Sequence, residues 1–267
     1  EALLVEEKSE GLWSAIVRKA GRIKTGELLE FCGGRLRAVA QERLEEGKWL
    51  LSFEEAELLK ERLEEFGLPP LPPYIERRQA SDLQNTEDRE RYQTCFASEP
   101  GAIAAPTAGL HFTPEILTEI SQRGIDILEV TLHVGLGTFS SIEVEDIRQH
   151  KMHAEFFSVS AQTLEQLKKY RQNQKKIICL GTTSVRVLET LAQRNFQVSS
   201  GWTDIFIHTP YEFKMMSGLL TNFHLPKSTL MLLVSAYCGR DFLLSAYRQA
   251  VENNYRFFSY GDCMLIL

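Results

Sequence analysis

One local pattern recurs along the C-terminal two thirds of this chain: a short apolar run ends in a polar turn and continues as an amphipathic stretch. Ile177–Leu180 is such a run, Gly181–Ser184 is its hydroxyl-rich turn, and Val185–Ala192 has the apolar spacing of a helix. This alternation predicts an α/β domain with a largely parallel sheet. Functional groups are then expected where the strands end.

The first 70 residues follow a different pattern, in which short β-like runs are separated by glycine-containing turns and followed by an acidic helical stretch over Phe53–Phe66. They predict a smaller β-barrel-like domain over residues 1–70. The proline-rich connector Pro69–Tyr74 leads to the α/β domain over residues 71–267. The chain opens without methionine on Glu1–Val5, which is typical of the middle of a strand, so we expect the first domain to be N-terminally incomplete.

The composition limits the class of protein. A chain of 267 residues with 43% hydrophobic residues can form two globular domains, and no apolar run is long enough for a membrane helix. Five widely spaced cysteines are typical of reduced thiols in the cytoplasm, and the lack of heptads favours a monomer. A net charge of −6 leaves only local basic clusters for nucleic acid: Lys168, Lys169, Arg171, Lys175 and Lys176, and Arg77, Arg78, Arg89 and Arg91.

The run Asn222–Leu230 combines an amide, the imidazole of His224 and the ammonium group of Lys227 on a loop that Pro226 stiffens. Serine and threonine follow, and either can cap the next helix. Donors at a helix N-terminus suit a polar or anionic ligand. A capped loop with a purely structural role is the alternative.

The turn after Leu180 offers backbone donors and hydroxyl groups at the start of a helix, a setting that suits a carboxylate or a phosphate. Arg186 adds a guanidinium group that can bind such an anion with two hydrogen bonds. The candidate binding residues are Gly181, Thr182, Thr183, Ser184, Arg186 and Asn222.

Three further histidines lie near the ends of predicted strands. His111 follows the apolar run Ala102–Ala105, and His133 lies in a run that ends in two glycines. His153 and Glu155 share one face of an extended segment, with His150 on the other face. No helical histidine pair or cysteine pair accompanies them, so the pattern does not favour a metal site.

Seven long motifs occur in order along the chain: PTAGLHFTP at 106–114, TLHVGLGTF at 131–139, HKMHAE at 150–155, GTTSVR at 181–186, GWTDIFI at 201–207, LLTNFHLPKSTL at 219–230 and YRFFSYGDCMLI at 255–266. Together they resemble the S-adenosylmethionine:tRNA ribosyltransferase-isomerases of queuosine biosynthesis. The resemblance extends from about Leu71 to the end and is much looser before it.

The resemblance implies that the 71–267 domain is catalytic and that S-adenosylmethionine is a co-substrate. Its ribosyl group would be transferred and isomerised onto 7-aminomethyl-7-deazaguanine at the wobble position of tRNA. Adenine and methionine would leave, and epoxyqueuosine would form. It implies no metal and no permanently bound cofactor.

Such chemistry needs a base, an acid near adenine and donors for the methionine carboxylate. The candidates for base and acid are His224, His153, His111 and His133. His224 and His153 come first because Lys227 and Lys151 are close in sequence and would lower the imidazole pKa. Thr182, Thr183, Ser184 and Arg186 would hold the methionine carboxylate or a phosphate.

An RNA base must leave its stack to enter a pocket, and aromatic side chains can hold it. The candidates are Trp202, Tyr211, Phe223 and Tyr260, and Asp204 could bind a ribose diol. Two other functions stay open at this stage. A methyltransferase would release S-adenosylhomocysteine, whereas a non-catalytic RNA-binding module would release nothing.

Overall fold

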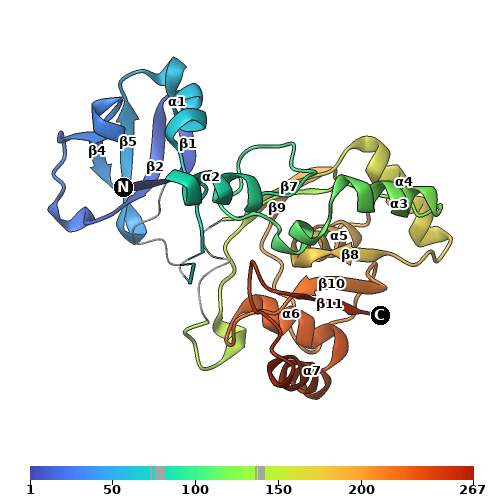
Figure 1. The fold of residues 1–267 in the computed structure, drawn as a ribbon. Helices are drawn as coiled ribbons and strands as arrows, with labels where there is room; N and C mark the ends of the chain where they lie inside the picture. The colour runs from blue at the N-terminus through green and yellow to red at the C-terminus, as the bar shows by residue number, and fades with distance from the viewer. Residues whose placement is uncertain (73, 76–81, 136, 138–141) are drawn as a thin grey trace. The chain divides into compact units, whose positions relative to one another are not determined.

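The computed structural model describes residues 1–72, 74–75, 82–135, 137 and 142–267, except for the side chains of Glu46 and residues 82–86 (Figure 1). The chain forms two compact units, each described here by itself. Unit 1 comprises Glu1–Pro70 and Ala80–Arg89, and unit 2 comprises Leu71–Gln79 and Glu90–Leu267.

Unit 1 is built on one antiparallel sheet in the order β1-β2-β5-β4-β3. Alternate residues of its central strand, Trp49, Leu51 and Phe53, are buried, as expected for a sheet with one face on a core. Because β1 and β3 lie at opposite edges, the sheet does not close, and the predicted barrel is wrong. The strands are β1 (Ala2–Ser9), β2 (Leu12–Val17), β3 (Leu28–Phe31), β4 (Leu36–Arg43) and β5 (Lys48–Phe53).

The predicted helical stretch after this sheet begins later than expected, because β5 extends to Phe53. A short 3₁₀ helix, Ala56–Leu58, leads into α1 (Leu59–Phe66), and α2 (Asp82–Arg91) follows along the chain. The guanidinium group of Arg89 donates to the carbonyl oxygens of Glu65 at 2.9 Å and Gly67 at 2.6 Å. These bonds satisfy carbonyl groups at the end of α1 that the helix leaves unpaired.

Unit 2 contains two three-stranded sheets (Figure 1). The first has the order β6-β7-β9 and is antiparallel throughout. In the second, β11-β10-β8, strand β10 pairs antiparallel with β11 and parallel with β8. The strands are β6 (Thr131–His133), β7 (Glu155–Ser158), β8 (Ile178–Leu180), β9 (Ser200–Thr203), β10 (Gly218–Asn222) and β11 (Cys263–Ile266).

Helix α5 is the central helix of unit 2, and almost its whole length is buried. Its residues Val185, Leu188 and Leu191 belong to the main hydrophobic core. The helices are α3 (Pro114–Gln122), α4 (Ala161–Gln172), α5 (Gly181–Gln193), α6 (Thr229–Cys238) and α7 (Arg240–Glu252). Side chains of Thr113, Ser160 and Ser228 accept hydrogen bonds from the first turns of α3, α4 and α6.

The prediction of a largely parallel sheet is wrong. Among the described strands, only β8 and β10 run parallel. The prediction treated every alternation of strand and helix as a crossover within one sheet. Instead, α4 connects β7 to β8 in the other sheet, and α6 and α7 lead to β11, which returns antiparallel.

Three other expectations are corrected or fall outside the description. Residues 102–105 are irregular rather than a strand, and they lead into a 3₁₀ helix, Thr107–His111. Arg77, Arg78 and part of the 131–139 motif (Leu136, Thr138 and Phe139) lie outside the described residues.

Among the described residues, no single helix is long and apolar enough to cross a membrane; α6 and α7 pass that test only as a pair, and the pair is bent by 111°.

Candidate active site

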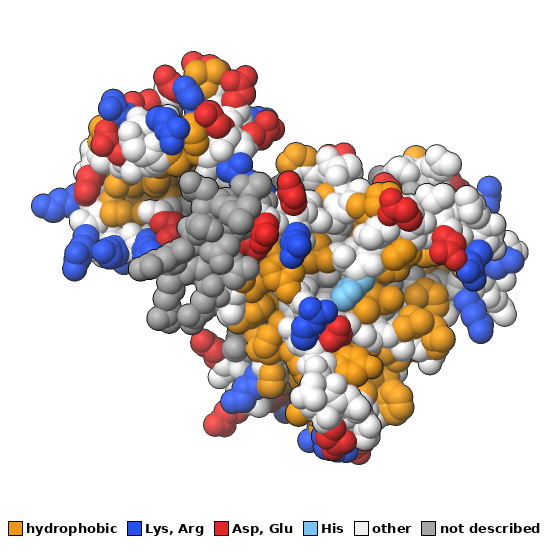
Figure 2. All heavy atoms as spheres, viewed as in Figure 1, with side chains coloured by type: hydrophobic (Ala, Val, Ile, Leu, Met, Phe, Trp, Pro, Cys, Tyr) orange, Lys and Arg blue, Asp and Glu red, His pale blue; other side chains and the backbone are white. Residues whose placement is uncertain are grey.

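A cleft in unit 2 opens where β8 and β10 end side by side, because these two strands are parallel. Figure 2 shows hydrophobic side chains gathered around β10, β11 and α6 in one view, with a histidine among them. The polar side chains that line the cleft come mainly from the two strand ends and the loops beside them: Tyr74, Thr107, Thr182, Thr183, Thr221, Asn222, His224, Ser228 and Ser259.

The first turn of α5 forms one wall of this cleft. Gly181 has a φ of +82°, and a Cβ atom there would lie 3.3 Å from the hydroxyl of Thr183, so glycine suits the position. Thr182 and Thr183 line the cleft, whereas the hydroxyl of Ser184 donates to the carbonyl of Leu180 at 2.8 Å. The amide groups of a first turn have no partner within the helix and carry partial positive charge. This wall can therefore bind an anion.

The structure does not bring Arg186 into the cleft. Arg186 is 4% exposed and forms an ion pair with Glu155 of β7, which also accepts the backbone N–H of Gly135 at 3.0 Å. The Nε and Nη2 atoms of Arg186 have no hydrogen-bond partner in the described part of the chain. Sequence analysis missed Glu155 as the partner, although its place on the buried face of a strand was visible in the alternation.

Asn222 joins three segments of unit 2 at the cleft. Its Oδ1 accepts from the Thr107 hydroxyl at 3.1 Å, and its Nδ2 donates to the carbonyl of Phe258 at 3.2 Å. The same Nδ2 lies 3.4 Å from Nε2 of His111. With the amide oriented by its first two bonds, Nε2 is the acceptor and the imidazole proton lies on Nδ1. Asn222 therefore positions His111, and its amide group is already hydrogen-bonded within the protein.

His224 is held on two sides in the cleft. Its Nε2 lies 2.8 Å from the hydroxyl of Thr221, and its backbone N–H donates to the hydroxyl of Tyr247 at 2.7 Å. Burial lowers the pKa of His224 to about 4. The imidazole is therefore neutral near pH 7. The cause is burial and not the ammonium group of Lys227, which is exposed.

His111 is half-buried at the edge of the cleft and has an acidic neighbour. Hydrogen bonding to the backbone N–H of Arg256, at 2.7 Å, lowers the pKa of Asp262, and the nearby charge of His111 adds to this effect.

The other two candidate histidines lie outside the cleft. His133 stacks on Phe156, with ring centroids 5.9 Å apart, and its Nδ1 is buried without a partner in the described part of the chain. His153 is exposed and packs against the backbone of Gly137. Of the four, His224 lines the cleft and His111 contacts a residue that does.

The candidate stacking residues are also separated. Phe223 is 3% exposed and packs against Tyr247, while Tyr211 donates to the buried carboxylate of Glu189 at 3.2 Å. Trp202 is 60% exposed on β9 and does not line the cleft.

Two other candidates lie at the surface. Tyr260 is half-exposed and meets Tyr92 edge to face, and Asp204 is exposed. Sequence analysis missed the pair formed by Tyr74 and Ser259, whose oxygen atoms are 2.6 Å apart on the cleft wall. Because Tyr74 and Ser259 are far apart in the sequence, no local pattern indicated that they are in contact.

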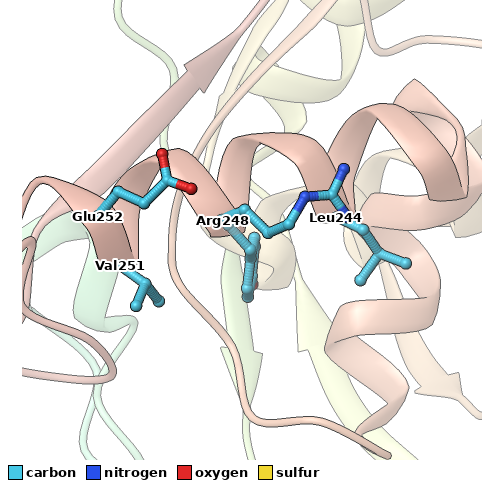
Figure 3. Close-up of a pocket in the computed structure, with 5 residues that line it drawn as sticks. Leu244, Arg248, Val251 and Glu252 are labelled. Atoms are coloured by element: carbon cyan, nitrogen blue, oxygen red, sulfur yellow. The ribbon is translucent and has the colours of Figure 1, made fainter.

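A second concavity lies along α7 and differs from the cleft (Figure 3). Its lining side chains come from successive turns of this one helix: Leu244, Tyr247, Arg248, Val251 and Glu252. Such a surface has no converging polar groups from other elements, so we do not regard it as the catalytic site. Among the described residues, no group of three His, Cys, Asp or Glu side chains is placed to hold a metal ion.

Comparison with known proteins places this chain in a family. The sequence model described as "Queuosine biosynthesis protein" matches residues 1–266. S-adenosylmethionine:tRNA ribosyltransferase-isomerases from Halothermothrix orenii and Staphylococcus epidermidis are each 46% identical over 269 residues, covering 100% of this chain and 77% of the relative. A crystal structure of S-adenosylmethionine tRNA ribosyltransferase from Thermotoga maritima aligns with a TM-score of 0.49 at 34% identity, covering 100% of this chain and 74% of that one.

The match over the whole chain confirms the resemblance drawn from the motifs and extends it through the first 70 residues, where the motifs were looser. It also confirms that the chain is an enzyme of the transferase and isomerase class. The sequence analysis alone had kept two other functions open. This chain therefore belongs to the queuosine biosynthesis family of S-adenosylmethionine:tRNA ribosyltransferase-isomerases.

Proposed function

We propose that this enzyme transfers and isomerises the ribosyl group of S-adenosylmethionine onto 7-aminomethyl-7-deazaguanine at the wobble position of tRNA. Epoxyqueuosine, adenine and methionine are the products. S-adenosylmethionine is consumed as a co-substrate, and no permanent cofactor takes part. The observation that carries the proposal is the cleft at the ends of β8 and β10, which the N-terminus of α5 and His224 line and at whose edge Asn222 contacts His111.

The methionine carboxylate lies at the N-terminus of α5 in this proposal. Thr182 and Thr183 line the cleft there, so their hydroxyls and the first-turn amides can donate to it. Burial of the wall strengthens each such hydrogen bond, because water competes less. Arg186 supports the same wall from behind through its ion pair with Glu155.

His111 is the general base in this proposal. The sulfonium group acidifies the 5′ hydrogens of the ribosyl group, and removal of one proton lets adenine leave. A base works best when its pKa is near the working pH, which disfavours His224 with a pKa of about 4. Asn222 holds the His111 ring through the 3.4 Å contact at Nε2, and that contact breaks when Nε2 takes the proton.

His224 has a different role in the same scheme. Because it is neutral and fixed by Thr221, it can hold a polar atom of the substrate without titrating. The substrate amine then attacks the activated ribosyl group, and methionine departs as the epoxide closes. His153, His133 and Lys227 are given no part in these steps: unlike His224 they do not line the cleft, and unlike His111 they have no described side-chain hydrogen bond to a residue that does.

A single-turnover reaction tests the proposal. The protein is mixed with labelled S-adenosylmethionine and tRNA that carries the aminomethyl-deazaguanine, and the small molecules and the digested RNA are analysed. Adenine, methionine and a new epoxy-cyclopentyl nucleoside in equal amounts support it. S-adenosylhomocysteine with methylated RNA would replace the proposed reaction by methyl transfer.

Action in the cytoplasm as a monomer completes the proposal. The five cysteines are all free in the structure, which fits a reducing compartment. Light scattering at working concentration should give the mass of one chain, and a stable mass of two chains would overturn this part of the proposal.

A further inference from the structure

The β6-β7-β9 sheet of unit 2 carries a row of three rings across its strands. His133 of β6 pairs directly with Phe156 of β7, and Phe156 pairs with Trp202 of β9. The ring centroids are 5.9 Å apart in the first pair and 5.8 Å apart in the second. Directly paired residues point to the same face of a sheet. The three rings, which we call the ring row, therefore form one surface.

The pleat of the sheet turns this row away from the core. Phe157 and Thr203, the next residues on their strands, are 0% and 2% exposed and face the interior. Trp202 by contrast is 60% exposed. A large indole left this open contributes little to folding, and an exposed aromatic surface commonly marks a binding site.

A second group of rings follows β9 along the chain. Phe206 and His208 flank the buried Ile207 and are themselves partly exposed. The ring of Phe206 is 4.8 Å from that of His208 and 5.2 Å from that of His150. These three rings form a group of their own after the ring row.

The two ends of the ring row have different neighbours along the chain. Val134 follows His133 directly and lines the cleft, and its carbonyl accepts the N–H of Ile103 at 2.8 Å. At the opposite end, the guanidinium group of Arg194 donates to the carbonyl of Trp202 at 2.6 Å. One end of the row is therefore next in sequence to a residue of the cleft wall, and the other end is bonded to a positively charged group.

We propose that the ring row is a stacking platform for an unpaired tRNA base next to the nucleotide that enters the cleft. Single-stranded RNA is commonly bound by aromatic and imidazole rings that stack on its bases. With a net charge of −6, this protein has less attraction for phosphates than most RNA-binding proteins, so stacking must supply more of the affinity. This inference rests on the proposed function, which makes tRNA the substrate.

The test compares Trp202→Ala, Trp202→Phe and a control, Phe242→Ala. Phe242 is 65% exposed on α7, outside the ring row, and so matches Trp202 in size and exposure. The dissociation constant of substrate tRNA is measured for each variant. We expect Trp202→Ala to raise it about 5- to 100-fold, Trp202→Phe to raise it only a few-fold, and Phe242→Ala to leave it unchanged.

Fluorescence gives a readout that a merely structural change would not produce. The protein has three tryptophans, Trp13, Trp49 and Trp202, and a base stacked on an indole quenches its emission. Titration with the anticodon stem-loop RNA should quench the wild-type emission. Trp202→Phe should remove that quenching while the far-UV spectrum and the affinity for S-adenosylmethionine stay unchanged.

Two results would overturn the inference. One is equal loss of tRNA affinity in Trp202→Ala and Phe242→Ala, or no loss in either. The other is unchanged RNA affinity together with a change of mass in light scattering, which would make the row an interface between copies of the chain. Adenine release by the wild-type enzyme is measured alongside, so failure of the ring row is distinguished from failure of the proposed reaction.

Discussion

The cleft and the ring row are adjacent in unit 2 but are built in opposite ways. In the cleft, polar side chains such as Asn222 and His224 are held by hydrogen bonds to neighbouring residues, so each has a fixed position and little freedom. In the ring row, Trp202 faces solvent, and its side chain contacts the ring of Phe156 beside it on the sheet. The difference teaches that polar networks hold reacting groups in place, whereas a pleated sheet can present an adaptable surface to a large substrate.

The largest effect should separate a histidine of the cleft from a histidine of the ring row. His111→Asn removes the proposed base and should lower the single-turnover rate by about 10²- to 10⁴-fold. His133→Asn should lower it less than about tenfold, because His133 contacts Phe156 and does not line the cleft. Rapid-quench measurement of adenine release checks both variants, and an equal loss in the two would remove the distinction between the regions.

The Glu155–Arg186 ion pair connects the two regions, since Glu155 precedes Phe156 on β7 and Arg186 belongs to α5. Glu155→Gln leaves a buried guanidinium group without its counter-charge and should lower the free energy of unfolding by about 3–5 kcal/mol. Urea denaturation measures this change.

A matched control for that variant is Glu165→Gln, which removes the exposed pair between Glu165 and Lys168. It should cost less than about 1 kcal/mol, because exposed pairs are screened by water. Comparable losses in the two variants would mean that the buried pair does not support the wall of the cleft.

His224 should make stability depend on pH. Its pKa falls from the ordinary value of 6.5 to about 4 on folding, so the unfolded chain binds more protons between these values. The neutral imidazole favours the folded state above about pH 6.5, and up to about 3 kcal/mol of stability is lost as the pH falls toward 4. Urea denaturation at several pH values measures the slope. His224→Gln should flatten it, and an unchanged slope would contradict the burial of this imidazole.

The sequence predicted local features of the fold better than features that depend on residues far apart in the chain. The turn and helix after Leu180 and a serine or threonine cap on the helix after Pro226 were predicted, because they depend on neighbouring residues. The parallel sheet was wrong, because strand order depends on where each connection leads.

The inward direction of Arg186 was also missed, as was the separation of His111 from His133 and His153. Both depend on contacts between residues far apart in the chain, such as the ion pair of Arg186 with Glu155 and the contact of His111 with Asn222. A motif lists chemical groups, but only the packed fold decides which of them face the same space.

The smallest effect should come from two helix caps. Ser228→Ala and Ser160→Ala each remove a side-chain bond to a first-turn amide, at 3.2 Å and 3.0 Å, and each should cost about 1 kcal/mol of stability. Only Ser228 lines the cleft, so only its variant should also lower kcat/KM. Thermal unfolding and steady-state kinetics test the pair, and a kinetic defect in Ser160→Ala would contradict the placement of the site.

The most direct test of the account measures two affinities on two variants, Thr182→Val in the cleft and Trp202→Ala in the ring row. Binding of S-adenosylmethionine is measured by calorimetry and binding of tRNA by filter retention. We predict that Thr182→Val weakens S-adenosylmethionine binding about tenfold and leaves tRNA binding unchanged. Trp202→Ala should weaken tRNA binding and leave S-adenosylmethionine binding unchanged. Loss of both affinities in both variants, or loss of neither, would contradict the division of the substrate between the two regions.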